Sequence, residues 1–142
     1  MRGFENIAGV LGLPPNDKVA ASPLNLVAKI ERGLPFKVVD RVACLLAPDD
    51  THFKYVLIPK PTYDRRKGGK LSPDQGTRMA RIARVWALAV DVWKSDADAR
   101  NFLFRPHAMI ENKRPFDVAL QSEFGAELVL DILGRLKYGT AA

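Results

Sequence analysis

The chain has 142 residues, 47% of them hydrophobic and 27% charged, and it carries a net charge of +6. This composition excludes an intrinsically disordered chain, and the length fits one domain or two very small ones. There is no apolar run of the roughly 20 residues that cross a membrane, no visible secretory signal, and one cysteine, Cys44, which cannot form an internal disulfide. These features predict a cytoplasmic protein.

The positive charge is concentrated in one part of the chain. Residues 54–84 hold nine Lys or Arg and two acidic residues, so this segment carries +7 and the remainder carries −1. A focused basic segment favours binding to a polyanion such as nucleic acid. The alternative is a solvated basic surface that binds nothing.

The first third of the chain predicts two helices after a loose beginning. Glycines and prolines interrupt residues 1–20, which we expect to form a flexible arm. Ser22, followed by a proline, predicts the start of a helix, and Gly33 predicts its end. A second helix should follow Pro35, because apolar residues recur there at three- and four-residue spacing as far as Leu46.

A short helix, a tight break and a short basic helix are expected next. The first covers residues 52–58, Pro59 disfavours helix at the residue before it, and the second begins at Pro61 and ends before Gly68. This order is that of a helix-turn-helix, whose second helix contacts DNA. We therefore predict such a domain over residues 21–70. Its candidate DNA-binding residues are Lys60, Thr62, Tyr63, Arg65, Arg66, Lys67 and Lys70.

A long helix is expected in the middle of the chain. Ser72 and Gln75 have the spacing of a capping box, so the helix should begin at Pro73 and extend to about Trp93. Apolar residues lie on two sides of it, which predicts burial on both sides. In so short a chain, the second side is expected to contact another subunit or a partner.

Three further helices are expected before the C-terminus. Two short ones should cover residues 96–104 and 115–120, and the last should begin after Ser122 and end at Gly139. Apolar residues repeat every four positions in the last helix from Phe124 onwards, and this repeat predicts its apolar face. The alternation typical of strands is not visible anywhere, so the predicted fold is all-α.

Several motifs of the C-terminal half, in this order, resemble those of the Xre/MbcA/ParS group of antitoxins. The similarity extends more loosely into the helix-turn-helix region, where Leu57-Ile58-Pro59 replaces the usual Ala-x-x-x-Gly. His107 and Ser122 replace the Asn and Thr that are common in the group. The motifs are LS at 71–72, FLFRP at 102–106, RPFD at 114–117, SEFG at 122–125 and GRLKYG at 134–139.

The resemblance implies an N-terminal helix-turn-helix-like bundle followed by a helical toxin-binding domain over residues 71–142. Proteins of this group are type II antitoxins that neutralise a RES-domain toxin, which consumes NAD or transfers ADP-ribose, by obstructing its active-site cleft. The implied partners are the cognate RES-domain toxin, a second copy of the chain within a toxin–antitoxin heterotetramer, and operator DNA for autoregulation. The alternative is a free-standing dimeric helix-turn-helix regulator without a toxin.

The end of the last helix is the candidate toxin contact. Gly134 inside a helix costs roughly 1 kcal/mol relative to Ala, which suggests close approach by a partner or by another helix. The cations after it either contact the toxin or complement the helix dipole. Residues 135–142 are expected to enter or cover the NAD cleft. The candidate toxin-binding residues are Arg105, Arg114, Pro115, Gly134, Arg135, Lys137, Tyr138 and Gly139.

The sequence contains no recognisable catalytic constellation. It has no glycine-rich phosphate loop, and His52 and His107 have no metal-ligand partners at suitable spacing. We therefore expect a binding protein that is not an enzyme and that uses no metal or cofactor.

Overall fold

The computed structural model describes residues 2–13 and 22–139, with side chains from Ile7 onwards. Within these ranges the chain forms helices and connecting turns without a strand, so the all-α prediction is confirmed. None of the described helices combines the length and apolar character needed to cross a membrane.

The helix boundaries agree closely with those expected for most of the chain. Local signals of capping and proline position therefore carry most of the secondary structure. In chain order the helices are α1 (Arg2–Leu11), α2 (Pro23–Arg32), α3 (Lys37–Leu46), α4 (Lys54–Leu57), α5 (Lys60–Arg66), α6 (Pro73–Trp93), α7 (Asp96–Phe104), the 3-10 turn η2 (Ala108–Ile110), α8 (Pro115–Gln121) and α9 (Glu123–Tyr138).

Serine caps explain where four of these helices begin. Each serine side chain accepts a hydrogen bond from a backbone N–H of the first turn: Ser22 in α2, Ser95 in α7 and Ser122 in α9. The expected capping box is present at α6. The Gln75 backbone N–H donates to Ser72 Oγ at 3.2 Å, and the Ser72 backbone N–H donates to Gln75 Oε1 at 2.9 Å.

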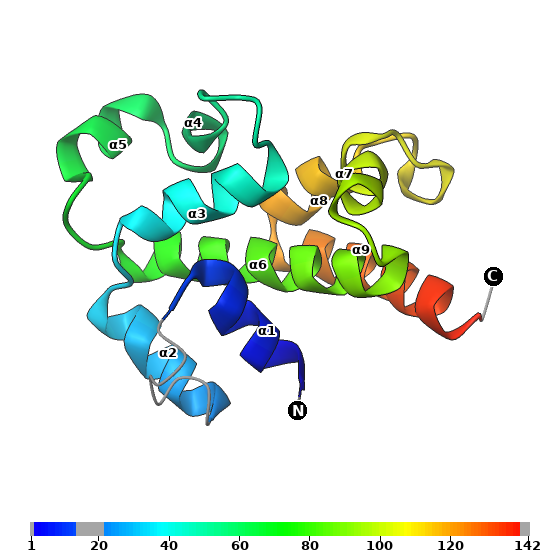
Figure 1. Cartoon of the computed structure of the whole chain (residues 1–142), viewed down its shortest axis with the longest axis horizontal. Coiled ribbons are helices and arrows are strands. Elements are labelled where there is room, and N and C mark those ends of the chain that lie inside the picture. Colours follow the sequence, from blue (N-terminus) through cyan, green and yellow to red (C-terminus); the bar gives the residue numbers. More distant parts are fainter. Residues whose placement is uncertain (1, 14–21, 140–142) are drawn as a thin grey trace.

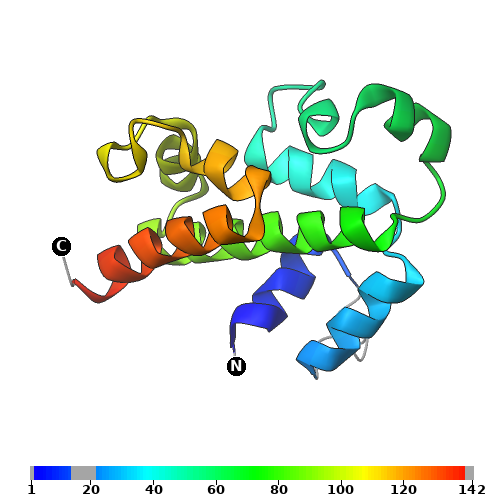
Figure 2. The same ribbon diagram turned by 180° about the vertical axis from the view of Figure 1, so that it is seen from behind.

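Helix α6 is the central element of the molecule. Figure 1 shows α6 along the long axis with α1 packed against it, and Figure 2, seen from behind, shows α9 in front of it. On the second apolar side of α6, Val85 is only 2% exposed, and Leu88 and Val92 pack against the same core. Helices of the same chain therefore cover both sides of α6, and no second subunit is needed to cover them.

The prediction of a flexible arm over residues 1–20 is wrong for the part that the structure describes. Helix α1 buries Ile7, Ala8 and Leu11 in the core, and Leu13 after it is also buried. Gly12 adopts a φ of +76° just after the helix, where glycine commonly ends a helix. Burial against α6 thus outweighs the low helix propensity of the glycines. Residues 14–21 of the expected arm lie outside the described ranges.

Candidate functional site

Helices α4 and α5 adopt the arrangement expected for a helix-turn-helix. Helix α4 ends at Leu57, and Ile58 is extended, with φ −134° and ψ 126°, before Pro59. This conformation is the one that a following proline favours. Leu57 and Ile58 are fully buried, so their packing fixes the turn and the orientation of α5.

The structure corrects the assignment of Tyr63 as a DNA contact. Tyr63 is only 6% exposed, and its ring lies edge-on to Phe36 and Tyr55 at centroid distances of 5.4 and 5.5 Å. Its hydroxyl donates a hydrogen bond to Asp40 at 2.5 Å. Burial, together with this hydrogen bond, raises the pKa of Tyr63 to about 12. Tyr63 therefore anchors α5 to α3 through the core instead of facing a ligand.

The other candidates of α5 and of the residues just after it are not buried as Tyr63 is. Lys60 donates to Asp64 at 2.6 Å, and this hydrogen bond raises the pKa of Lys60 and lowers that of Asp64. Thr62 is half-buried. The remaining candidates are exposed, and none forms an ion pair with another described residue, so their charge is available to a polyanion: Arg65, Arg66, Lys67 and Lys70.

Helix α9 presents an exposed row of side chains along one face. Residues 124, 128, 131, 135 and 138 follow the spacing that places residues on one side of a helix. Phe124 and Tyr138 are 75% and 74% exposed, and Leu128 is also exposed. The opposite side of α9 is buried and includes Val129 and Leu133. The four-residue repeat from Phe124 was expected to form the apolar face toward the core. Its members Phe124, Leu128 and Leu136 are instead exposed, and only Ile132 is buried.

A hollow of about 400 Å³ lies beside this exposed row. Residues around η2 form one wall, with Met109 exposed, and α8 and α9 form the other, with Leu128 and Arg135. The hollow combines apolar side chains with both signs of charge, as protein-binding surfaces often do. Sequence reasoning missed Met109 and Leu128 as surface residues, because no local pattern distinguishes them from core.

Comparison with known proteins assigns both regions to one family. Residues 26–84 match the antitoxin Xre-like helix-turn-helix domain, and residues 88–139 match the antitoxin Xre/MbcA/ParS C-terminal toxin-binding domain. The chain is 30% identical over 133 residues to Antitoxin Xre of Yersinia enterocolitica serotype O:8 / biotype 1B, which covers 91% of this chain and 86% of that protein. It is also 30% identical over 142 residues to Antitoxin Xre of Photorhabdus laumondii subsp. laumondii, with 88% and 95% covered.

The chain belongs to the Xre/MbcA/ParS antitoxin family. The interval between its two domain matches falls inside α6, so one continuous helix is shared by the helix-turn-helix domain and the toxin-binding domain of this antitoxin. The α5 cations lie in the first match and the exposed row of α9 lies in the second.

The candidate toxin-binding residues of this antitoxin do not form one cluster. Arg105 lines a separate hollow with Asp49 and Asp50, which shares no residue with the hollow beside α9. Arg114 donates two hydrogen bonds to Asp117, each 2.8 Å long, and these hold the pKa of Arg114 above its usual value. Pro115 is buried at the start of α8. Arg114 and Pro115 therefore shape the α8 corner.

The remaining candidates lie on the last turns of α9. Lys137 contacts Asp91 of α6 at 2.5 Å, which joins the ends of the two helices. Arg135 and Tyr138 are exposed, and Gly139 ends α9 with a φ of +67°. A Cβ built at Gly134 would have nothing within 4 Å, so no described part of the chain makes the close approach suggested for it. Residues 140–142 lie outside the described ranges.

Arg81 is a structural residue of the antitoxin whose partners the sequence does not show. Its guanidinium donates to the backbone carbonyls of Ala119 and Leu120 at 3.0 and 2.8 Å, and these carbonyls lie in the last turn of α8. Partial burial lowers the pKa of Arg81. Arg81 thus satisfies carbonyls that a helix end leaves without partners, and it joins α6 to α8.

Proposed function

We propose that this chain is a type II antitoxin that neutralises a cognate RES-domain toxin and binds operator DNA to repress its own operon. The toxin is expected to consume NAD or to transfer ADP-ribose. In this proposal, the exposed row of α9 and the residues after Leu133 obstruct the toxin's active-site cleft, and α5 contacts the DNA.

The observation that carries the proposal is the exposed row of α9. Phe124, Leu128 and Tyr138 place three large side chains on one solvent-facing side of a helix whose opposite side is buried. A row of this kind, rimmed by charge, is typical of a protein-binding surface, and a helix that presents such a row commonly docks in a groove. Asp131 and Arg135 lie within the row and would set its register against a partner.

The nature of the toxin is inferred from the resemblance of the C-terminal motifs and from charge. A cleft that binds NAD must accommodate its diphosphate, and Arg is the side chain best suited to compete for such an anion site. Arg135 is exposed at the end of α9 and forms no ion pair with another described residue, whereas Lys137 is held by Asp91. Arg135 is therefore the cation expected to enter the cleft.

Homodimerisation within a heterotetramer belongs to the same proposal. The second apolar side of α6, which was expected to contact another subunit or a partner, is covered by helices of the same chain. A homodimer is proposed because soluble oligomers generally prefer two-fold symmetry. The mass of the purified complex with the toxin tests it directly.

The first experiment is affinity purification of the tagged antitoxin from its native cell, followed by mass spectrometry. We expect a RES-domain protein in near-stoichiometric amount. Recovery of only the antitoxin and DNA would contradict toxin neutralisation and favour the free-standing regulator.

A paired set of variants then tests the surface. Phe124→Asp with Leu128→Asp should abolish rescue of cells that express the toxin, because two carboxylates would be desolvated in the interface. Leu24→Asp with Val27→Asp makes the same chemical change at exposed positions of α2 and should preserve rescue. Equal rescue by both pairs would exclude the α9 row as the toxin contact.

A further inference from the structure

A second basic region lies outside α5, around a hollow of about 420 Å³. The hollow is lined by residues from the end of α1, from α2 and from α3. Among the described residues that line it, Lys29, Lys37 and Arg41 carry positive charge and none carries negative charge. It also opens over the first turn of α3, where the helix dipole adds positive potential.

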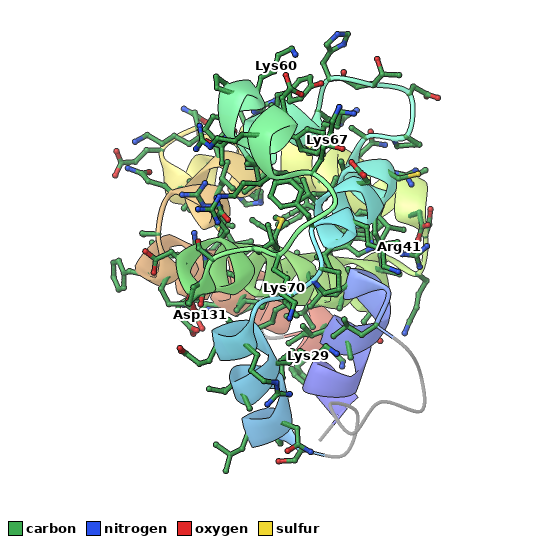
Figure 3. The ribbon with its side chains drawn as sticks, turned by 90° about the vertical axis from the view of Figure 1, so that its left-hand side faces the viewer. Lys29, Arg41, Lys60, Lys67, Lys70 and Asp131 are labelled. Carbon is green, nitrogen blue, oxygen red and sulfur yellow. The ribbon has the colours of Figure 1, made fainter. Side chains whose placement is uncertain are left out.

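This region is continuous with the cations that follow α5. Lys37 and Pro35 also line a smaller hollow together with Lys67, so the two hollows are neighbours. Lys70 pairs with Pro35 through an isolated β-bridge, and its side chain lies beside Gly33 at the end of α2. Figure 3 shows Lys29, Arg41, Lys67 and Lys70 on one face of the molecule.

Two acidic groups near this face are hydrogen-bonded within the chain, and Asp40 also lines the smaller hollow. Asp40, on the same helix as Lys37 and Arg41, accepts the hydroxyl of Tyr63, and Asp64 accepts Lys60. Tyr63 is neutral, so Asp40 keeps its negative charge, and Glu31 of α2 is also exposed. The cations of this face still outnumber these two carboxylates and leave it net positive: Lys29, Lys37, Arg41, Lys67 and Lys70. Clustered Lys and Arg on one face are the electrostatic signature of a surface that binds nucleic-acid phosphates.

We infer that Lys29, Lys37 and Arg41 form a second phosphate-binding surface, which holds the backbone of duplex DNA next to the segment contacted by α5. This inference rests on the DNA binding included in the proposed function. Helix α5 has only seven residues and Tyr63 is buried, so it offers few side chains to the DNA. Contacts between side chains of α2 and α3 and the DNA backbone would supply the affinity and the orientation that so short a helix lacks.

The test compares DNA affinity over a range of salt concentrations. The probes are a duplex that covers the region upstream of the protein's own coding sequence and a shuffled duplex of equal composition. For Lys37→Gln with Arg41→Gln, we expect the slope of log affinity against log salt to become shallower by about 1.8, because each lost phosphate contact removes about 0.9. The loss should be equal on both duplexes, since phosphates carry no sequence information.

The matched control removes the same charge elsewhere. Arg84→Gln with Lys94→Gln alters an exposed cation of α6 and the exposed cation just after it, both outside the basic face, and should leave the slope unchanged. Arg41 lies against Gly12, so the fold of the double variant is checked by circular dichroism. If that variant is unfolded, Lys37→Gln alone should still reduce the slope by about 0.9.

The outcomes separate this inference from the proposed function. An unchanged slope for Lys37→Gln with Arg41→Gln, beside a reduced slope for Arg65→Gln with Arg66→Gln, would overturn the second surface and leave DNA binding by α5 intact. Failure of the wild-type protein to bind either duplex would overturn both DNA assignments. Rescue from the toxin is measured in a separate assay and would stand in either case.

Discussion

Two glycines of α9 have opposite surroundings. A Cβ at Gly125 would lie 2.1 Å from the backbone oxygen of Val118, whereas a Cβ at Gly134 would lie in open space. Gly125→Ala should therefore lower the free energy of unfolding by about 1–3 kcal/mol, because α8 and α9 would be forced apart. Gly134→Ala should raise it by about 1 kcal/mol through helix propensity. Urea denaturation measures both, and effects of the same sign would contradict this packing.

The buried hydroxyl of Tyr63 predicts a loss of stability at alkaline pH. The pKa of Tyr63 is about 12 in the folded chain and about 10 when unfolded. Between these values the unfolded chain releases the phenolic proton and the folded chain retains it, so the free energy of unfolding falls as pH rises from about 10 to about 12. Tyr63→Phe should lose about 1 kcal/mol near neutral pH, through the missing hydrogen bond to Asp40.

The pH dependence distinguishes titration of Tyr63 from other causes. Tyr63→Phe has no phenolic proton, so its stability should decline less than that of the wild type over the same pH interval. Tyr55→Phe removes a partly buried phenol that has no hydrogen bond to a carboxylate among the described residues, and it serves as the comparison. Parallel curves for Tyr63→Phe and the wild type would show that Tyr63 does not titrate in this range.

Helix α1 should be essential for stability. Leu11 is 1% exposed within the core that α1 forms with α3 and α6. Leu11→Ala should lower the free energy of unfolding by about 2–5 kcal/mol, as expected when a buried leucine leaves a cavity. Val27→Ala on the exposed side of α2 should change it by no more than about 0.5 kcal/mol. Similar melting curves for both variants would instead support a loosely attached N-terminus.

Secondary structure could be predicted here because its signals are local. Ser72 and Gln75 lie three residues apart and define the start of α6, and Pro59 defines the break before α5. Which side of a helix is buried is decided by contacts far apart in sequence. Helix α9 turns its buried face to α6 and α8, and the close approach at Gly125 depends on Val118. No periodicity within α9 could show that Phe124 would be exposed.

The same distinction holds for the candidate sites. The exposed cations of α5 could be predicted from a charge cluster within a few residues of sequence. The burial of Tyr63 could not, because it depends on Asp40, 23 residues earlier, and on the rings of Phe36, just before α3, and Tyr55 of α4. The hollow around Lys29 and Arg41 combines three helices, so its basic lining is not visible in any one stretch of sequence.

In the whole molecule, the proposed DNA contact on α5 and the proposed toxin contact at the end of α9 lie at opposite ends of α6. Helix α5 lies near the N-terminal end of α6, and the last turn of α9 is joined to its C-terminal end through Lys137 and Asp91 (Figure 1). Binding of a toxin at one end and of DNA at the other would therefore use separate side chains. Damage to one surface should leave the other function intact.

Deleting the residues after Leu133 tests this separation. Among the described residues removed, only Gly134 is half-buried and all the others are exposed. The loss of the partly exposed Lys137–Asp91 pair should lower the free energy of unfolding by no more than about 1 kcal/mol. The truncated chain should therefore fold and keep the wild-type affinity and salt slope for the upstream duplex. It should fail to rescue cells from the toxin, because Arg135 and Tyr138 are absent.

Full rescue by the folded truncated chain would show that the end of α9 does not obstruct the toxin's cleft. If the folded truncated chain lost both DNA binding and rescue, the toxin-binding and DNA-binding surfaces would be coupled through α6.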